Sequence, residues 1–224
     1  MADRRSHSLI AGRPKVDAQR EVYDVPDMTL LVAILAAGAS RRLGTPKQLL
    51  CVEGEALLRR QCRVALAADV GAVVVVVGCH AKPCAELIAD LPVAVCENTE
   101  WSEGLASSLR CATCSAIECQ TEGLLVLPCD QYCITEEDLR VLRDAWRQSQ
   151  GAACVSRYYE RTGPPAIIPA DCYDNVRQLR GDKGARAVLF DPRRSHPVQV
   201  DVPRAAFDFD LPSDLAHARK VLCR

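Results

Sequence analysis

Residues 31–50, LVAILAAGASRRLGTPKQLL, decide how this chain folds and where its chemistry is to be sought. The opening apolar run has no polar alternation, which is typical of a parallel strand buried on both faces. The run ends in small residues at 36–40, and Arg41, Arg42 and Lys47 follow. A strand leading into a small-residue turn, with exposed backbone N–H groups and nearby cations, predicts a phosphate-binding loop. The alternative is an ordinary strand-to-loop turn with solvated basic side chains.

This loop belongs to neither of the two common phosphate-binding patterns. G-K-[ST] and G-x-G-x-x-G are both absent, so it is not a Walker A loop or a dinucleotide fingerprint. Any nucleotide chemistry must therefore be argued from the other segments of the chain.

Composition and charge limit the classes of partner. The chain has 224 residues, of which 49% are hydrophobic and 25% charged, so it can bury a sizeable core like an ordinary globular protein. Its formal net charge of −1 provides no general field that would gather nucleic acid. No apolar stretch approaches the ~20 residues that cross a bilayer. We therefore expect neither a nucleic-acid partner nor a membrane partner.

The chain contains thirteen cysteines, an odd number without regular spacing. No export signal is evident, so a disulfide framework is not expected. Cys111-x2-Cys114 followed by Cys129-x3-Cys133 comes near the spacing of a zinc ribbon. However, the first pair falls on an expected helix and the second flanks Asp130 at a strand end, where cysteines serve as small apolar residues. These features predict reduced thiols and a cytoplasmic protein.

Two regions of the chain differ in character. Residues 1–28 are polar and charged and have no sustained period, which predicts a flexible N-terminal extension. Residues 29–224 alternate apolar strands with amphipathic helices, which predicts a single domain. Strands are expected at 31–35, 73–77, 93–96, 124–127, 152–156 and 198–202, and helices at 56–68, 83–90, 107–119 and 136–146. This α/β order predicts a doubly wound, mostly parallel sheet with helices on both faces.

Ligands of such sheets bind beyond the carboxyl ends of the strands. This rule brings four separate segments to one rim, those of Gly38, Ser107, Asp130 and Asp210. Ser107 and Ser108 can offer hydroxyl groups to a ligand, or they can simply cap the helix that follows. Likewise, Asp130 and the later pair Asp208 and Asp210 can serve a site, or they can form turns.

Several segments resemble one protein family. LAAGASRRLGTPKQLL is similar to the signature L-A-A-G-x-S-x-R-M-G-x-P-K-Q-L-L of the MobA-like nucleotidyltransferases, and most similar to the molybdenum cofactor cytidylyltransferases among them. Four later segments resemble family motifs in the family order: GLASSLR at 104–110, GPP at 163–165, GDKGAR at 181–186 and DFDLPSD at 208–214. The resemblance covers most of the chain and implies the Rossmann-like nucleotidyltransferase fold.

The resemblance also implies roles for individual residues. The nucleotide-binding residues would be Leu35, Ala36, Ala37, Gly38, Arg42, Lys47, Ser107, Ser108 and Asp130. The catalytic residues would be Arg42, Lys47, Asp130 and Asp210. Asp130 and Asp210 would ligate Mg²⁺, with Asp208 either orienting that ligand or replacing it. The acceptor would contact Gly163, Pro164, Lys183 and Arg186.

These residue types suit nucleotidyl transfer. A nucleoside triphosphate carries about four negative charges, which must be neutralised before an anionic nucleophile can approach its α-phosphorus. Magnesium held by one or two carboxylates does this while keeping water and phosphate ligands. Arginine and lysine near the β- and γ-phosphates stabilise the departing pyrophosphate. If the nucleophile is a phosphate, it is already ionised at neutral pH and needs no general base.

The resemblance implies transfer of CMP from CTP to the phosphate of a molybdopterin-type molybdenum cofactor, with release of pyrophosphate. Leu-Ala-Ala-Gly is the usual cytidylyl form of the motif, whereas Leu-Ala-Gly-Gly is the guanylyl form. A molybdoenzyme or its maturation chaperone is the implied protein partner. The alternatives are GTP as donor, a sugar or alditol phosphate as acceptor, and a non-catalytic carrier of the cofactor. Tyr132 stands where the family usually has proline, and we expect this departure to affect the acceptor side.

Overall fold

The computed structural model describes residues 29–209 of the chain. The expected N-terminal extension (1–28), Asp210 and the C-terminal helix that the sequence predicts, with Pro212 at its first position, lie outside the described residues. The strands are β1 (Leu30–Ala36), β2 (Cys51–Val52), β3 (Glu55–Ala56), β4 (Ala72–Val77), β5 (Ala94–Glu97), β6 (Gly123–Pro128), β7 (Cys154–Tyr158), β8 (Arg161–Pro169) and β9 (Val198–Asp201). The α-helices are α1 (Leu57–Ala68), α2 (Ala81–Leu87), α3 (Leu105–Glu118), α4 (Glu136–Gln148), α5 (Tyr173–Arg177) and α6 (Arg186–Leu189). The 3₁₀ helices are η1 (Lys47–Leu49), η2 (Trp101–Glu103), η3 (Ala170–Cys172) and η4 (Pro203–Ala206).

A seven-stranded sheet with the order β5-β4-β1-β6-β8-β7-β9 forms the centre of the molecule. Strand β1 pairs in parallel with both β4 and β6, and β7 pairs in parallel with β9. Only β8 runs against its neighbours β6 and β7 among the strands of this sheet. The predicted doubly wound, mostly parallel sheet is therefore confirmed.

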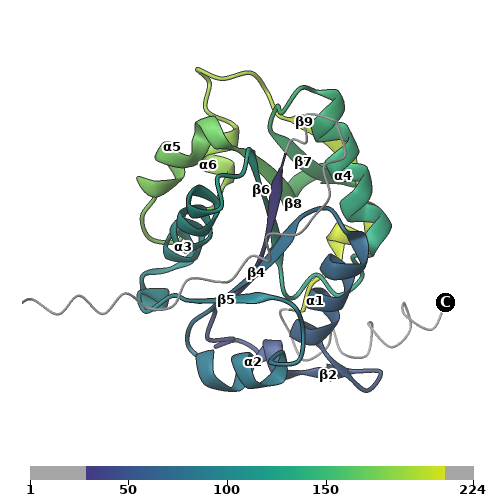
Figure 1. Ribbon diagram of the computed structural model, residues 1–224, viewed down its shortest axis with the longest axis vertical. Helices are drawn as coiled ribbons and strands as arrows, with labels where there is room; N and C mark the ends of the chain where they lie inside the picture. Colours follow the sequence, from purple (N-terminus) through teal and green to yellow (C-terminus); the bar gives the residue numbers. More distant parts are fainter. Residues whose placement is uncertain (1–28, 210–224) are drawn as a thin grey trace, which may run out of the picture.

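Strand β1 is buried on both faces, as its unbroken apolar sequence predicts. Val32 and Ile34 pack in a core with residues of α1, α2 and α4. Leu31 and Ala33 point the other way and pack in a second core with residues of α3, α5 and α6. Figure 1 shows these helix layers on opposite sides of the sheet. Because β1 lies between β4 and β6 and between both layers, the loop that leaves it is anchored firmly.

The expected helices lie close to their predicted positions, and the start of α4 shows why. Threonine followed by aspartate three residues later is a capping pattern typical of a helix start, and here Asp138 Oδ2 accepts hydrogen bonds from the backbone N–H (2.9 Å) and hydroxyl (2.8 Å) of Thr135. Such a cap stabilises a helix by about 1 kcal/mol. Trp146 near the other end of α4 is fully buried against the sheet.

Among the strands of the central sheet, β8 is the one that the hydrophobic pattern did not predict. Its first half contains Arg161, Gly163 and Pro164, which give it no apolar alternation. Its second half supplies the buried residues Ile167 and Ile168, which pair with β6 and β7. β8 therefore brings the Gly-Pro-Pro segment next to the carboxyl end of β6.

The described part of the chain contains no helix long and apolar enough to cross a membrane.

Candidate functional site

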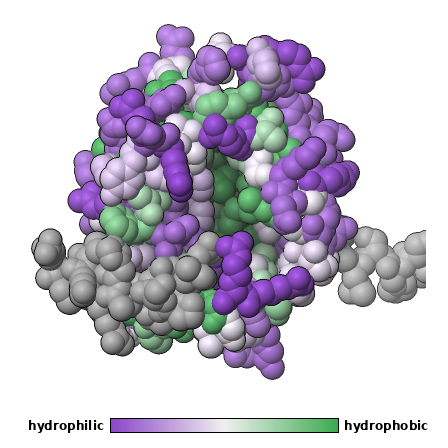
Figure 2. All heavy atoms as spheres, turned by 180° about the vertical axis from the view of Figure 1, so that it is seen from behind, coloured by the Kyte–Doolittle hydropathy of each residue, from purple (hydrophilic) through white to green (hydrophobic). Residues whose placement is uncertain are grey.

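A cleft of about 880 Å³ lies beyond the carboxyl ends of β1 and β6. Figure 2 shows a hollow in this protein with a largely hydrophobic floor between hydrophilic banks. The residues lining the cleft come from the loop after β1, η2 and the start of α3, the tip of β6, the β7–β8 hairpin, the segment of Asp182, and the end of η4 with the residues after it. Its volume falls in the range of pockets that hold small molecules. Distant parts of the sequence therefore meet at the rim that the sheet rule predicts.

The loop after β1, residues 37–47, takes its shape from one buried glutamine. Gln48 is fully buried, and its amide Nε2 donates hydrogen bonds to the carbonyl oxygens of Ala36 (2.8 Å) and Gly38 (2.6 Å). The backbone N–H of Lys47 donates to Ser40 Oγ (3.0 Å), which closes the loop from its other side. These three bonds hold the small-residue turn open toward the cleft. We call residues 37–47 the β1 loop.

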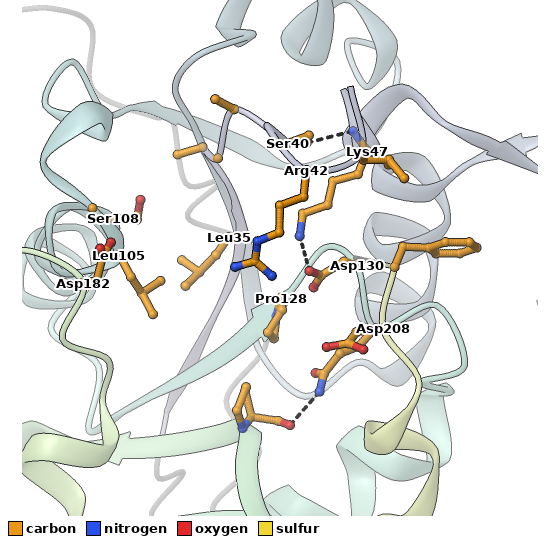
Figure 3. Close-up of a pocket in the computed structure, with 18 of the residues that line it drawn as sticks. Leu35, Ser40, Arg42, Lys47, Leu105, Ser108, Pro128, Asp130, Asp182 and Asp208 are labelled. Atoms are coloured by element: carbon orange, nitrogen blue, oxygen red, sulfur yellow. Dashed lines mark hydrogen bonds and ion pairs between the residues drawn. The ribbon is translucent and has the colours of Figure 1, made fainter. Parts of the chain in front are cut away.

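Lysine and arginine of the β1 loop meet a carboxylate at the tip of β6. The Lys47 ammonium donates to Asp130 Oδ2, and both side chains are largely shielded from solvent. Figure 3 shows the Arg42 side chain pointing into the cleft between Leu35 and Pro128. Two cations and a carboxylate thus converge where a polyphosphate and a divalent cation can be bound together.

Asp208 approaches the same place from the end of the described chain. The backbone N–H of Phe209 donates to the carbonyl oxygen of Asp130 (3.2 Å), so this segment lies alongside the tip of β6. Asp208 lines the cleft, and its carboxylate lies near that of Asp130 in Figure 3. Asp210, the expected metal ligand, lies outside the described residues.

Tyr132 affects the site indirectly. This residue, which departs from the family pattern, was expected to affect the acceptor side, but it is buried and does not line the cleft. Its ring packs on that of Phe209 with the ring centroids 4.3 Å apart. Because Phe209 follows Asp208 directly, Tyr132 helps to hold that carboxylate at the cleft.

Gln131 links the tip of β6 to two other elements of the cleft wall. Its amide Nε2 donates to the carbonyl oxygens of Pro164 (2.8 Å) and Ala205 (2.9 Å). The neighbouring Cys129 is fully buried, and burial raises the pKa of its thiol. This thiol stays protonated at neutral pH and cannot serve as a nucleophile.

The two serines of α3 have different surroundings. Asn98 Nδ2 donates to both hydroxyl oxygens, at 2.8 Å for Ser107 and 3.1 Å for Ser108. The Ser107 hydroxyl in turn donates to the Gly104 carbonyl (2.8 Å), and Ser107 borders a neighbouring hollow rather than the cleft. Ser108 lines the cleft. Ser107 therefore stabilises the helix start, whereas Ser108 is placed to meet a ligand.

An arginine network holds the Gly-Asp-Lys-Gly segment against the start of α3. The Arg110 guanidinium donates to the Glu103 carboxylate and to the Leu179 carbonyl (2.9 Å). Glu103 also accepts a hydrogen bond from the backbone N–H of Gly181 (3.0 Å), and these contacts, that of Arg110 foremost, lower the pKa of Glu103 to about 2. The network places Asp182 on the bank of the cleft beside Ser108 (Figure 3).

Gly104 must be glycine for this contact to form. Its φ angle is +123°, a conformation that other residues rarely adopt. A side chain here would also collide with the Asp182 carboxylate and the Gly181 backbone. The glycine of the GLASSLR segment therefore permits the close approach of residues 181–182.

Not all of the expected site residues line the cleft. Those that do are Leu35, Ala37, Gly38, Arg42, Lys47, Ser108, Asp130, Pro164 and Asp208. Ala36 points its side chain into the core and offers its carbonyl to Gln48. Gly163, Lys183 and Arg186 lie outside the cleft lining. Arg186 donates to Thr162 Oγ1 (2.8 Å) and stacks over the Phe190 ring at 4.4 Å, so its guanidinium is occupied within the fold.

The cleft also contains residues that the motifs did not assign. Among them are Trp101, Tyr158, Arg161 and Asp182. Asp182 lies inside the GDKGAR segment, in which the family resemblance implies the two basic residues Lys183 and Arg186 as acceptor contacts. Arg161 lies just outside the GPP segment, and only the β7–β8 hairpin brings it to the cleft.

Residues 32–198 match the family model of the MobA-like NTP transferase domain. This match spans well over half of the sequence. The chain belongs to the MobA-like NTP transferase family.

Individual relatives agree with this assignment. The purine catabolism protein PucB of Bacillus subtilis is 28% identical over 174 residues, which are 71% of this chain and 80% of that protein. The crystal structure of Rv0371c from Mycobacterium tuberculosis is 27% identical with a TM-score of 0.71, covering 86% of this chain and 98% of that one. A manganese complex of Rv0371c also matches, with 23% identity and a TM-score of 0.67.

A more distant structure shows the shared fold alone. Molybdopterin-guanine dinucleotide biosynthesis protein A of Archaeoglobus fulgidus is 17% identical with a TM-score of 0.61, over 86% of this chain and 98% of that one. The family resemblance seen in the sequence is thus confirmed, and family membership supports nucleotidyl transfer as the activity.

The central role of Gln48 can be tested by substitution with methionine, which has similar length but no donor. Gln48→Met removes the hydrogen bonds to the carbonyls of Ala36 and Gly38, and the loss of the buried bond to Ala36 costs about 1–3 kcal/mol. We expect a lower free energy of unfolding in urea. We also expect roughly tenfold weaker binding of nucleoside triphosphate by calorimetry, because the β1 loop loses its shape.

Gln178→Met is the matched control, because Gln178 is exposed on the surface after α5. The control should retain the stability and affinity of the wild-type protein. If Gln48→Met also retains both, the buried amide does not determine the shape of the loop.

Proposed function

We propose that this protein transfers CMP from CTP to the phosphate of a molybdopterin-type molybdenum cofactor and releases pyrophosphate. The observation that carries this proposal is the convergence of Arg42, Lys47 and Asp130 at the mouth of the β1 loop. Three charged groups at a strand rim suit a triphosphate with a divalent cation. The similarity to a protein named for molybdopterin-guanine dinucleotide biosynthesis supports a molybdopterin acceptor.

The phosphate chain of CTP would lie along the β1 loop. Arg42 and Lys47 would contact its β- and γ-phosphates and stabilise the charge that develops on pyrophosphate as it leaves. Lys47 would exchange its ion pair with Asp130 for these phosphate oxygens, because both partners are charged and within reach of the same space. The nucleoside would extend toward Ser108 and the backbone at Ala37 and Gly38.

The carboxylates at the cleft fit a divalent cation. Asp130 and Asp208 both face the cleft, and carboxylate oxygens are the ligands that Mg²⁺ and Mn²⁺ prefer. Asp130 and Asp210 would hold magnesium, with Asp208 orienting the ligand or replacing it. The bound cation would neutralise charge on the α-phosphate. The manganese complex of Rv0371c supports a divalent cation in this protein.

The transfer itself needs no proton acceptor. An oxygen of the acceptor phosphate, already ionised at neutral pH, attacks the α-phosphorus of CTP. The bond between the α-phosphorus and the bridging oxygen to the β-phosphate breaks, and this oxygen leaves with pyrophosphate. Alignment of the two phosphates and neutralisation of their charge by Arg42 and Lys47 supply the rate enhancement.

The alternatives differ from this proposal in the nucleotide donor, in the acceptor, or in the class of protein. GTP could replace CTP, and a sugar or alditol phosphate could replace molybdopterin, without any change in the mechanism. A non-catalytic carrier of the cofactor would not need Arg42, Lys47 and Asp130 arranged around a triphosphate site. We further propose a cytoplasmic reaction, consistent with the thirteen cysteines, whose product passes to a molybdoenzyme or its maturation chaperone.

The donor and the acceptor are tested together by mass spectrometry of the reaction products. The protein is incubated with molybdopterin, magnesium and either CTP or GTP. We expect the cytosine dinucleotide and pyrophosphate, with less guanine product, because Ala37 borders the cleft where the guanylyl form of the motif has glycine. Ala37→Gly should increase the guanine product. Equal or greater product from GTP in the wild type would contradict the cytidylyl assignment, and no nucleotide product would contradict the transfer.

The carboxylates are tested by substitution with asparagine, which nearly preserves their shape. Asp130→Asn and Asp210→Asn should each lower turnover at saturating CTP and magnesium by on the order of a hundredfold, because the phosphate charges are then poorly neutralised. Asp208→Asn should cost less, since we assign it an orienting role. The measurement is the steady-state rate of pyrophosphate release.

Asp174→Asn serves as the control, because Asp174 is an exposed residue of α5 paired only with Arg177 in the described chain. Its turnover should match that of the wild type. If Asp208→Asn is the most damaging of the variants, Asp208 and not Asp210 is the ligand. If no variant falls tenfold, the cation is held elsewhere.

A further inference from the structure

The β7–β8 hairpin brings to the cleft a cation that no family motif assigns. Tyr158 and Arg161 are directly paired across this hairpin, and both line the cleft together with Pro164. The other basic residues in the lining, Arg41, Arg42 and Lys47, all belong to the β1 loop. Among the described residues, Arg161 is thus the only basic residue that lines the cleft away from the proposed triphosphate site.

The surroundings of Arg161 leave its guanidinium available. In the described part of the chain it makes no hydrogen bond or ion pair with another side chain. Arg186, by contrast, is occupied by Thr162 and Phe190, and Lys183 is exposed outside the cleft. The guanidinium best placed for an anionic acceptor is therefore that of Arg161.

Tyr158 and Arg161 line the same cleft as Asp130 and Asp208, the carboxylates of the proposed reaction centre. Because Tyr158 and Arg161 are paired across the β7–β8 hairpin, the hairpin forms the wall of the cleft that carries both side chains. Burial raises the pKa of the Tyr158 phenol, and the Asp208 carboxylate raises it further, whereas Arg161 and Arg186 act in the opposite direction. The phenol therefore stays protonated at neutral pH and can donate a hydrogen bond.

A phosphate nucleophile needs a cation on its own side of the cleft. It carries up to about two negative charges and must approach both an anionic α-phosphate and two carboxylates. Arg42 and Lys47 are assigned to the triphosphate, so a separate group must attract the acceptor. The planar guanidinium of arginine binds two oxygens of a phosphate at once and fits this need better than a lysine.

We propose that Arg161, with the Tyr158 hydroxyl as a second donor, binds the phosphate of the acceptor substrate. This proposal rests on the proposed function and defines its acceptor as a phosphomonoester, in contrast to a free alcohol or a sugar acid. Two of the three non-ester oxygens are held by the guanidinium, and the third attacks the α-phosphorus. Arg161 keeps its protons throughout.

The test compares Arg161→Gln and Arg161→Lys in transfer from CTP, with magnesium, to molybdopterin, ribitol 5-phosphate and glucose 1-phosphate. For whichever of these the wild type accepts, Arg161→Gln should raise the KM of the acceptor roughly tenfold or more and leave the KM of CTP unchanged. The acceptor KM of Arg161→Lys should lie between those of the wild type and Arg161→Gln, because the lysine ammonium is a point charge and cannot bind two phosphate oxygens as the guanidinium does. Calorimetry with a non-hydrolysable CTP analogue should show the same loss of acceptor affinity without turnover.

Arg157→Gln is the matched control, since Arg157 lies on the same hairpin, is paired with Asp201 (Nε–Oδ1 2.6 Å) and does not line the cleft. It should behave as the wild type. Wild-type acceptor affinity in Arg161→Gln would overturn the assignment of Arg161. A wild type that binds CTP but transfers to none of the phosphomonoesters would overturn the acceptor class, whereas failure to bind CTP at all would overturn the proposed function itself.

Discussion

The hydrogen bonds from one buried glutamine determine the geometry on which the rest of the site depends. Gln48 binds the backbone at both sides of Ala37, where β1 has ended and the loop begins. The bond to Ala36 is buried, where an unpaired carbonyl is costly, and the partly buried bond to Gly38 adds a second restraint, so together they favour a single loop conformation. The neighbouring residue Lys47 is then delivered to Asp130 at the tip of the adjacent strand. Lys47, which supplies the charge, is thus followed directly in the sequence by Gln48, whose amide holds the loop that positions it.

The sheet order explains how the other parts of the cleft come together. Strand β6 lies between β1 and β8, so its tip carries Asp130 with the β1 loop on one side and the Gly-Pro-Pro segment on the other. Gln131 connects this tip to β8 and η4 through two hydrogen bonds. A triphosphate bound on the β1 loop and an acceptor bound near β8 would therefore meet at Asp130. The proposed chemistry depends on this arrangement, in which the triphosphate area on the β1 loop and the acceptor area near β8 adjoin at Asp130.

Local sequence was sufficient to predict the fold, because buried parallel strands and capped amphipathic helices have clear patterns. The apolar run of β1 and the Thr135 cap of α4 are examples, and both are present in the structure. The site was less predictable where a role depends on tertiary contacts. Ser107 and Ser108 are adjacent and chemically identical, so the sequence cannot tell their roles apart. In the structure, the hydrogen bond from the Ser107 hydroxyl to the Gly104 carbonyl shows that Ser107 supports the start of the helix.

The same limit applies to charged side chains near a motif. Arg186 matches a family motif but is bound by Thr162 and Phe190, while Arg161 matches none and lines the cleft. Which arginine faces the cleft depends on the pairing of β7 with β8, and β8 lacks the alternation that would have predicted it. Motifs identified the segments that form the site, and packing determined which of their side chains reach it.

The central claim is that the cleft beyond β1 and β6 binds a nucleoside triphosphate with its phosphates on the β1 loop. The most direct measurement is a crystal structure of the protein with a non-hydrolysable CTP analogue and manganese, whose anomalous scattering locates the cation. We expect the phosphates within hydrogen-bonding distance of Arg42 and Lys47, the cation bound to Asp130, and Lys47 no longer paired with that carboxylate. A nucleotide bound elsewhere, or a cation that does not contact Asp130, would contradict this account.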